Sequence, residues 1–237
     1  LSENLLLETD SDIFDRIVVL TAEDQGYWGA LPNIRVIPNP LPFTSEETSS
    51  CKATKVVAVG RYDFQKNFSK LLQLWARIVP QFPEWTLEIY GNGALRGELE
   101  QEVKELGISG SVTLAQPTHQ MKEVYLSASI YAMTSRYEGL PMVLIEAQQM
   151  GLPIVSFACP CGPRDVIHDG EDGFLIPMGE DDIFLKALTT LMASEEKRIC
   201  MGQRAREASA RYEVDAVMNK WLTLFSELVP TKPTAGL

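Results

Sequence analysis

Residues 136–155 read RYEGLPMVLIEAQQMGLPIV and form the most informative segment of the chain. Their apolar part predicts a helix over Met142–Met150, and the residues that follow predict a buried strand over Pro153–Phe157. Another strand is expected just upstream, at Ile130–Met133. A strand, a helix and a second strand in this order make a parallel βαβ unit.

The same alternation continues on both sides of this segment. Further strands are expected at Lys55–Gly60, Trp85–Tyr90, Ser111–Leu114 and Gly173–Ile176, with helices at Asn67–Val79, Leu95–Leu106, His119–Ser127 and just after Pro163. Strict alternation predicts the α/β class, here a Rossmann-like parallel sheet with helices on both faces. After Gly179 the pattern is entirely helical, over Asp181–Met192, Glu195–Ala208 and Val214–Leu228.

The two ends of the chain differ from its middle. Short strands are expected at Arg16–Leu20 and Ile34–Ile37, followed by a proline-stiffened stretch and a polar linker at Ser45–Ser50. The last helix carries an apolar stripe at Trp221, Leu224, Phe225 and Leu228. We expect this stripe to be partly exposed, or buried in a homodimer contact.

Composition limits the possible functions. The 237 residues are 45% apolar, enough for a sizeable core, and their formal charge of −11 argues against a general nucleic-acid-binding protein. The four cysteines lack the spacing of a zinc site, so we expect reduced thiols in a cytoplasmic protein. No apolar run reaches the ~18 residues of a membrane span. The N-terminal segment has neither a signal peptide's pattern nor an initiator Met, and we expect a piece of a longer protein.

Two loops at the carboxyl ends of predicted strands are suited to phosphate groups. In the first, Arg61 follows Gly60 and Lys66 opens the next helix, so both cations can converge on a diphosphate. Taken alone, such a pair is more often a solvated surface feature. In the second, Gly91 and Gly93 let the backbone approach a ligand closely. Their spacing to the next glycine is one residue too long for a dinucleotide fingerprint.

Glu138 and Glu146 frame the third loop. Glu138 follows a predicted strand, and Gly139 frees backbone amides to face a ligand. Pro141 suits the first turn of the following helix. Glu146 is expected about two turns into that helix, on the side of its start, where a carboxylate can accept from both hydroxyls of a ribose. A glutamate in so apolar a helix needs a partner, which argues against an ordinary surface residue.

Other catalytic templates find little support. The chain has no GxxxxGK[ST] phosphate loop, no GxSxG elbow and no HExxH motif. His119 and His168 lie in turn-like contexts and are not assigned as bases. Asp10-Ser11-Asp12 has the form of a metal–nucleotide site, but it precedes a predicted helical turn and suits helix capping. We therefore assign no metal and no cofactor.

These motifs, in their order along the chain, resemble the nucleotide-binding, C-terminal half of retaining GT-B glycosyltransferases of group 1, family 4. The resemblance covers about Arg16 to Leu228. Members have two Rossmann-like domains, with the donor nucleotide on the C-terminal one and the acceptor mainly on the N-terminal one. The resemblance implies a remnant of the acceptor domain and a linker at 1–43, the donor-binding domain at 44–212, and a helix that packs toward the N-terminal domain, with a tail, at 213–237.

The resemblance also implies roles for individual residues. Arg61 and Lys66 would bind the donor diphosphate and stabilise the leaving nucleotide, in place of a metal. Glu138 would contact the donor sugar, and these three form the expected catalytic set. The expected donor-binding residues are Gly60, Gly91, Gly93, Leu114, Gln116, Pro117, Gly139, Leu140, Met142 and Glu146, with Glu146 on the ribose and 114–117 on the base.

The loop SFACPCGPRDVI (156–167) is similar to a loop of bacterial hexosyl- and N-acetylgalactosaminyltransferases that use UDP-sugars, although Ala158 and Asp165 replace the usual Asp and Glu. The resemblance implies retaining, metal-independent transfer of a hexose or N-acetylhexosamine from a nucleotide-sugar to a glycan or lipid-linked acceptor, with poor turnover by this part alone. The loop favours UDP over GDP as the nucleotide. Polysaccharide synthesis is the expected context, and peripheral attachment of the full-length protein to the inner membrane face stays open. The alternative function is a non-catalytic module that binds a nucleotide-sugar. An NAD-dependent oxidoreductase is disfavoured, because the spacing of Gly91, Gly93 and the next glycine does not match the dinucleotide-binding fingerprint.

Overall fold

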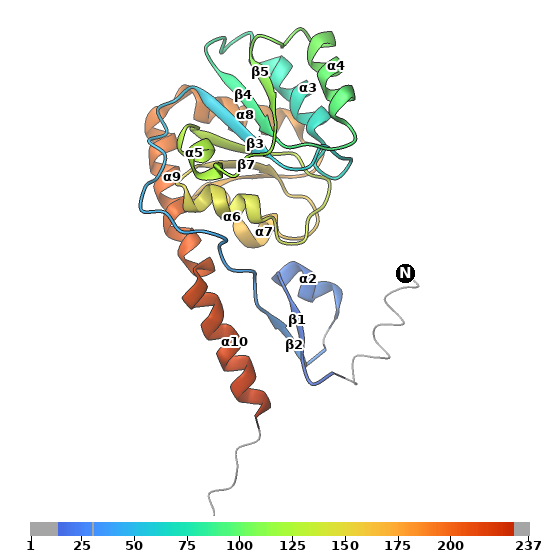
Figure 1. The fold of residues 1–237 in the computed structure, drawn as a ribbon, viewed down its shortest axis with the longest axis vertical. Coiled ribbons are helices and arrows are strands. Elements are labelled where there is room, and N and C mark those ends of the chain that lie inside the picture. Colours follow the sequence, from blue (N-terminus) through green and yellow to red (C-terminus); the bar gives the residue numbers. More distant parts are fainter. Residues whose placement is uncertain (1–13, 30, 230–237) are drawn as a thin grey trace, which may run out of the picture.

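The computed structural model describes residues 14–29 and 31–229 (Figure 1). Its main sheet has six parallel strands in the order β5-β4-β3-β6-β7-β8. They are β3 (Lys55–Val59), β4 (Thr86–Tyr90), β5 (Val112–Ala115), β6 (Ile130–Met133), β7 (Ile154–Phe157) and β8 (Gly173–Ile176). The predicted α/β class and parallel sheet are confirmed, with strand ends shifted by a residue at most.

Helices cover both faces of this sheet, as expected (Figure 1). One face carries α3 (Phe68–Ile78), α4 (Arg96–Glu105) and α8 (Asp181–Ala193); the other carries α5 (Met121–Leu126), α6 (Met142–Gln149) and α7 (Pro163–Val166). α9 (Glu195–Ser209) contacts both α6 and α8. The apolar period explains the packing, because α3 buries Leu71, Leu74, Trp75 and Ile78 at i, i+3, i+4 and i+7.

The starts of two helices differ from the predictions made from the sequence. Lys66 does not open α3, since Asn67 is the N-cap in a left-handed conformation (φ 53°) and the helix begins at Phe68. Pro141 precedes α6 in an extended conformation rather than lying in its first turn. Glu146 is therefore four residues into α6, about one turn rather than two.

The N-terminal part is a small parallel unit of β1 (Ile17–Val19) and β2 (Ile34–Val36). Between them lies α2 (Ala22–Tyr27), which was not predicted. It is only six residues long and buries no side chain, so it has no apolar period to detect.

The 3-10 turn Ala210–Tyr212 leads from α9 into α10 (Val214–Leu228), which runs beside β1 and β2 (Figure 1). The predicted apolar stripe on α10 is only partly buried. Leu224 is buried with Ile37, and Trp221 is half-buried against the same cluster. Phe225 remains 52% exposed and Leu228 39% exposed. No helix among the described residues is long and apolar enough to cross a membrane.

Candidate functional site

The candidate site lies where the direction of the sheet reverses. From β3 the chain builds outward to β4 and β5 on one side, and from β6 to β7 and β8 on the other. β3 and β6 are paired neighbours, so the loops after them meet at one carboxyl edge. Open parallel sheets bind ligands at such a switch point.

Lys66 and Glu138 meet at this point. Lys66 Nζ lies 2.7 Å from Glu138 Oε1, and the two side chains are only 14% and 6% exposed. Gly60 leaves room for this arrangement, because a Cβ there would lie 2.9–3.0 Å from the Lys66 side chain. Because little water reaches this ion pair, electrostatic interactions there are stronger than at the surface. An anionic ligand could therefore compete with Glu138 for Lys66.

The Arg61 side chain does not pair with the same group as Lys66. Its side chain is 76% exposed, and its Nε lies 3.3 Å from Asp63 Oδ2. The other carboxylate oxygen of Asp63 accepts from the Lys66 amide at 3.0 Å. The structure thus shows one sheltered cation and one solvated cation on the same loop, rather than the expected convergence.

Gln65 connects this loop to the loop after β6. Its amide nitrogen donates to the Tyr137 carbonyl at 3.0 Å and lies 3.4 Å from Glu138 Oε2. The Glu138 amide in turn donates to the Pro160 carbonyl at 2.9 Å, so the loop after β7 supports the same carboxylate. Three loops therefore fix the position of Glu138.

Glu146 has the partner that its apolar helix requires. The hydroxyl of the fully buried Tyr125 donates to Glu146 Oε2 at 2.7 Å. Burial raises the pKa of Glu146, and the Tyr125 hydrogen bond opposes that rise by stabilising the carboxylate. Burial, with the Glu146 charge next, raises the pKa of Tyr125 well above its ordinary value, so the hydroxyl stays protonated as the donor.

Gly91 and Gly93 approach a neighbouring loop. A Cβ on Gly91 would lie 1.8 Å from the Gly60 carbonyl oxygen, and one on Gly93 would lie 2.4 Å from the Tyr62 carbonyl oxygen. The Tyr62 amide also donates to the Asn92 carbonyl at 2.9 Å. These glycines therefore let the loops after β3 and β4 pack together, which supports the loop that carries Lys66.

The expected base-lining segment lies at the end of β5. Gln116 and Pro117 are exposed. The Leu114 carbonyl accepts from Arg96 Nη2 at 3.1 Å, so a ligand would share that acceptor or displace Arg96. This arginine was not singled out in the sequence.

The start of α6 faces an open space. A Cβ on Gly139 would meet nothing within 4 Å. Behind it, Gly162 (φ 97°) packs so closely that a Cβ would lie 2.4 Å from Pro141 Cδ and 2.6 Å from the Gly139 carbonyl oxygen. Leu140 is buried and Met142 half-buried beside this turn.

Other expectations concern metals, histidines and thiols. The described residues contain no group of three or more His, Cys, Asp or Glu side chains arranged for a metal ion. His119 is exposed, and His168 Nδ1 lies 2.8 Å from the buried carboxylate of Asp172 at the edge of the fold. Asp10-Ser11-Asp12 lies outside the described residues. The cysteines Cys51, Cys159, Cys161 and Cys200 are free thiols.

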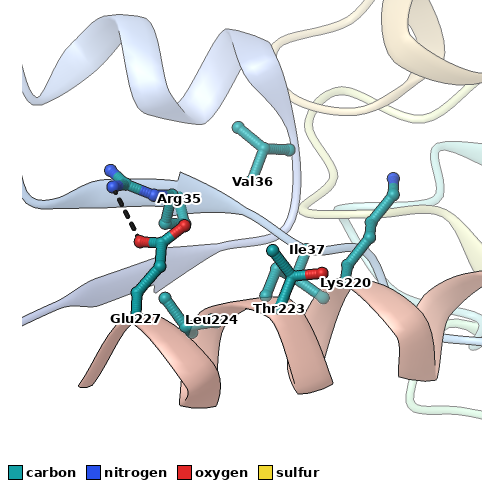
Figure 2. A pocket seen from close by; sticks show the side chains of 7 residues that line it. All are labelled: Arg35, Val36, Ile37, Lys220, Thr223, Leu224 and Glu227. Atoms are coloured by element: carbon teal, nitrogen blue, oxygen red, sulfur yellow. Dashed lines mark hydrogen bonds and ion pairs between the residues drawn. The ribbon is translucent and has the colours of Figure 1, made fainter. Parts of the chain in front are cut away.

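A separate pocket of about 230 Å³ lies between β2 and α10 (Figure 2). Arg35 from β2 and Glu227 from α10 form an ion pair across it, with a nitrogen–oxygen distance of 3.1 Å. This pocket is distant in the fold from the edge that holds Lys66, and it belongs to the contact between α10 and the N-terminal unit (Figure 1).

Sequence reasoning missed Tyr125 and Gln65. Tyr125 lies on a short helix, where an aromatic residue predicts core packing; the only signal for its role is that Glu146 needs a buried partner. Gln65 lies inside the Arg61–Lys66 loop, and no pattern in the sequence shows that its amide crosses to the next loop.

Comparisons with known proteins identify the family of the chain. Residues 44–208 match the family of glycosyl transferases group 1. The chain is 37% identical over 217 residues to the amylovoran biosynthesis glycosyltransferase AmsD of Erwinia amylovora, covering 87% of the chain and 61% of AmsD. It is 29% identical over 219 residues to an alpha-1,4-N-acetyl-D-galactosaminyltransferase of Campylobacter jejuni, covering 90% of the chain and 60% of that protein. The chain thus spans about three fifths of these two relatives.

Solved structures agree on the fold. TarM of S. aureus superposes with a TM-score of 0.84 at 22% identity, covering 95% of the chain and 46% of TarM. HepE of Anabaena superposes with a TM-score of 0.81 at 20% identity, covering 95% of the chain and 67% of HepE. These likenesses show the C-terminal portion of a GT-B fold. The match over residues 44–208 and the 37% identity to AmsD establish that the chain belongs to the group 1 family of glycosyl transferases.

Proposed function

We propose that this chain is the donor-binding part of a retaining, metal-independent glycosyltransferase that transfers a hexose or N-acetylhexosamine from a UDP-sugar. The acceptor is a glycan or lipid-linked sugar of bacterial polysaccharide synthesis, bound mainly by the remaining part of the full-length protein. The observation that carries the proposal is the sheltered Lys66–Glu138 pair at the switch point, with Glu146 on the adjoining helix.

The donor lies along this edge in an extended arrangement. Its ribose hydroxyls donate to Glu146, whose carboxylate has one hydrogen bond among the described side chains, from Tyr125. Its diphosphate reaches the start of α6, where unpaired helix amides and the helix dipole favour an anion. Its sugar lies beside Glu138, whose position three loops hold.

The chemistry follows from charge. When the bond between the anomeric carbon and the diphosphate oxygen breaks, the electron pair leaves with the nucleotide, and negative charge grows on the diphosphate. Lys66 transfers from Glu138 to this charge, and the exposed Arg61 swings from Asp63 onto it. Fixed cations at a developing charge lower the barrier for the step. The oxygen of the acceptor hydroxyl then bonds to the anomeric carbon on the same face of the sugar, and the hydroxyl proton passes to the departing diphosphate oxygen.

Support for UDP comes from relatives. TarM and HepE have both been solved in complex with UDP. The relative from Campylobacter jejuni is an N-acetylgalactosaminyltransferase by name. Both facts concern those proteins, and they agree with the similarity of residues 156–167 to UDP-sugar-dependent enzymes.

Titration calorimetry with UDP, GDP and ADP, with EDTA present throughout, tests the proposal. We expect UDP to bind best, and Arg61→Ala to weaken it about tenfold or more through the loss of a charge-assisted contact. Because Arg61 is 76% exposed, this variant should melt at the temperature of the parent. Arg77→Ala is the matched control, since Arg77 pairs only with the exposed Asp182 among the described residues.

Failure of all three nucleotides to bind would overturn the proposed donor site. UDP could bind while the full-length protein releases no UDP from UDP-glucose, UDP-galactose or their N-acetyl analogues. That result would favour the alternative function, a non-catalytic nucleotide-sugar-binding module, over a transferase.

A further inference from the structure

Two exposed aromatic side chains flank the candidate site. Phe64 is 65% exposed and Tyr137 is 50% exposed, and each lies within two residues of the Lys66–Glu138 pair. A single exposed aromatic side chain is ordinary on a protein surface. Two of them at the mouth of one site, on loops from neighbouring strands, call for a physical explanation.

The Phe64 ring is held in place from behind. The Arg136 guanidinium lies over the ring, with its Cζ 4.2 Å from the ring centroid. Arg136 Nη2 donates to Asn67 Oδ1 at 2.9 Å, and Nε donates to the Phe64 carbonyl at 3.2 Å. One face of the ring is therefore covered by an anchored cation, while Phe64 as a whole stays 65% exposed.

Tyr137 is anchored through its backbone. Its carbonyl accepts from the Gln65 amide, and the next residue, Glu138, donates its amide to Pro160. The Arg136 amide also donates to the Gln65 carbonyl at 2.8 Å. The two aromatic residues therefore lie on a rigid double loop, which lowers the entropy cost of binding a partner.

Phe64 and Glu146 are tied to helices that cover opposite faces of the sheet. Arg136 joins Phe64 to Asn67, the cap of α3, and α3 covers one face. Glu146 joins α6 to Tyr125 on α5, and these helices cover the other face (Figure 1). A donor that runs from Glu146 to Glu138, as proposed above, would leave Phe64 free on the far side of its sugar, with Tyr137 next to Glu138 in the chain.

We propose that Phe64 and Tyr137 form a stacking platform for a pyranose ring of the acceptor glycan, an inference that rests on the proposed function. A pyranose presents one face of C–H groups that packs flat on an aromatic ring, while its hydroxyl edge needs polar partners. Arg61 and Gln65, which can supply such partners, lie on the same loop as Phe64, and the exposed Tyr137 carries a hydroxyl. A lipid or protein partner would need a larger continuous apolar patch.

Saturation-transfer-difference NMR on the 237-residue chain tests this platform. Each sample holds UDP together with one probe: methyl α-D-glucopyranoside, methyl α-D-galactopyranoside or methyl N-acetyl-α-D-galactosaminide. We expect saturation on one face of the ring of at least one probe, with a fivefold or greater loss in Phe64→Ala and recovery in Phe64→Tyr. Phe14→Ala is the control, because Phe14 is 59% exposed just before β1 in the N-terminal unit.

The UDP signals in the same spectra separate this inference from the proposed function. Unchanged uracil and ribose signals in Phe64→Ala, with the glycoside signal lost, support the platform. Saturated UDP beside an unsaturated glycoside, or a glycoside signal that survives both Phe64→Ala and Tyr137→Ala, overturns it. Glycoside saturation that depends on Phe64, without any on UDP, keeps the sugar platform and overturns the donor site instead.

Discussion

Burial favours the protonated form of Glu146, whereas the proposed contact with the ribose needs its ionised form. Burial raises the pKa of its carboxyl, whereas the Tyr125 hydrogen bond lowers it. In the proposed complex only the ionised form accepts from two ribose hydroxyls. Affinity for UDP should therefore fall as the pH drops through the raised pKa of Glu146, at a higher pH than for a solvated glutamate.

Tyr125→Phe removes the hydrogen bond that favours the charged form. The pKa of Glu146 should then rise further, and the loss of UDP affinity should move to higher pH than in the parent protein. Dissociation constants measured from acidic to neutral pH in both proteins give the shift, and the ionisation of UDP itself is common to both. Glu146→Gln should bind weakly with no such shift. Superimposable curves for Tyr125→Phe and the parent would contradict this role for Glu146.

Gly91 and Gly97 offer a matched comparison of two glycines. Gly91→Ala places a methyl group 1.8 Å from the Gly60 carbonyl oxygen, so we expect a loss of about 3 kcal/mol in the free energy of unfolding. Gly97→Ala meets nothing within 4 Å inside α4, so we expect a gain of about 0.5–1 kcal/mol. Urea unfolding measures both, and equal stabilities would refute the close packing of these loops.

Among single residues, the sequence could predict which ones gather at the switch point but not how they pair. Glu138, Lys66 and Glu146 follow from strand ends and one helix, because parallel topology brings those ends together. The Asp63 contact of Arg61 and the Tyr125 contact of Glu146 depend on side-chain rotamers and on a helix far away in sequence. No periodic pattern encodes such contacts.

At the scale of elements, the long periodic helices and apolar strands were predictable, and the short α2 was not. α2 is too short to be stable alone. It depends on a neighbour, because Asp165 Oδ1 accepts from the Ala22 amide at 2.6 Å and Arg164 lies 3.2 Å from Glu23. Asp165, which replaces the usual Glu of the similar UDP-sugar loop, thus accepts from the first amides of α2, beside the N-cap residue Thr21.

Asp165→Ala should release α2. We expect faster hydrogen exchange at the Ala22 and Glu23 amides and a loss of about 1 kcal/mol in the free energy of unfolding. Asp182→Ala serves as the control, since that side chain is 87% exposed and far from α2. Unchanged exchange at both amides in Asp165→Ala would show that the cap does not hold the helix.

At the scale of the whole molecule, α10 presents an open apolar face. Met218, Leu222 and Phe225 are 44%, 62% and 52% exposed at i, i+4 and i+7. The opposite side of the helix is covered, with Leu224 buried against the N-terminal unit and Glu227 paired with Arg35 (Figure 2).

The apolar side of α10 is expected from the sequence to be partly exposed or buried in a homodimer contact, and a second copy of the chain would cover this face in the latter case. Light scattering should then give about twice the monomer mass of 26.4 kDa at high protein concentration. Leu222→Lys with Phe225→Lys should restore the monomer mass, whereas Ile183→Lys, at a 45% exposed residue of α8, should not. A monomer mass for the unsubstituted chain would exclude self-association through α10.

The central claim is that Lys66, Glu138 and Glu146 form a donor site for a UDP-sugar, and a crystal structure of the chain soaked with UDP tests it most directly. We predict that Lys66 Nζ lies within hydrogen-bond distance of the diphosphate, released from its 2.7 Å contact with Glu138, and that Glu146 accepts from the ribose hydroxyls. UDP bound elsewhere, as in the pocket between β2 and α10, with the Lys66–Glu138 pair still closed, would contradict the account.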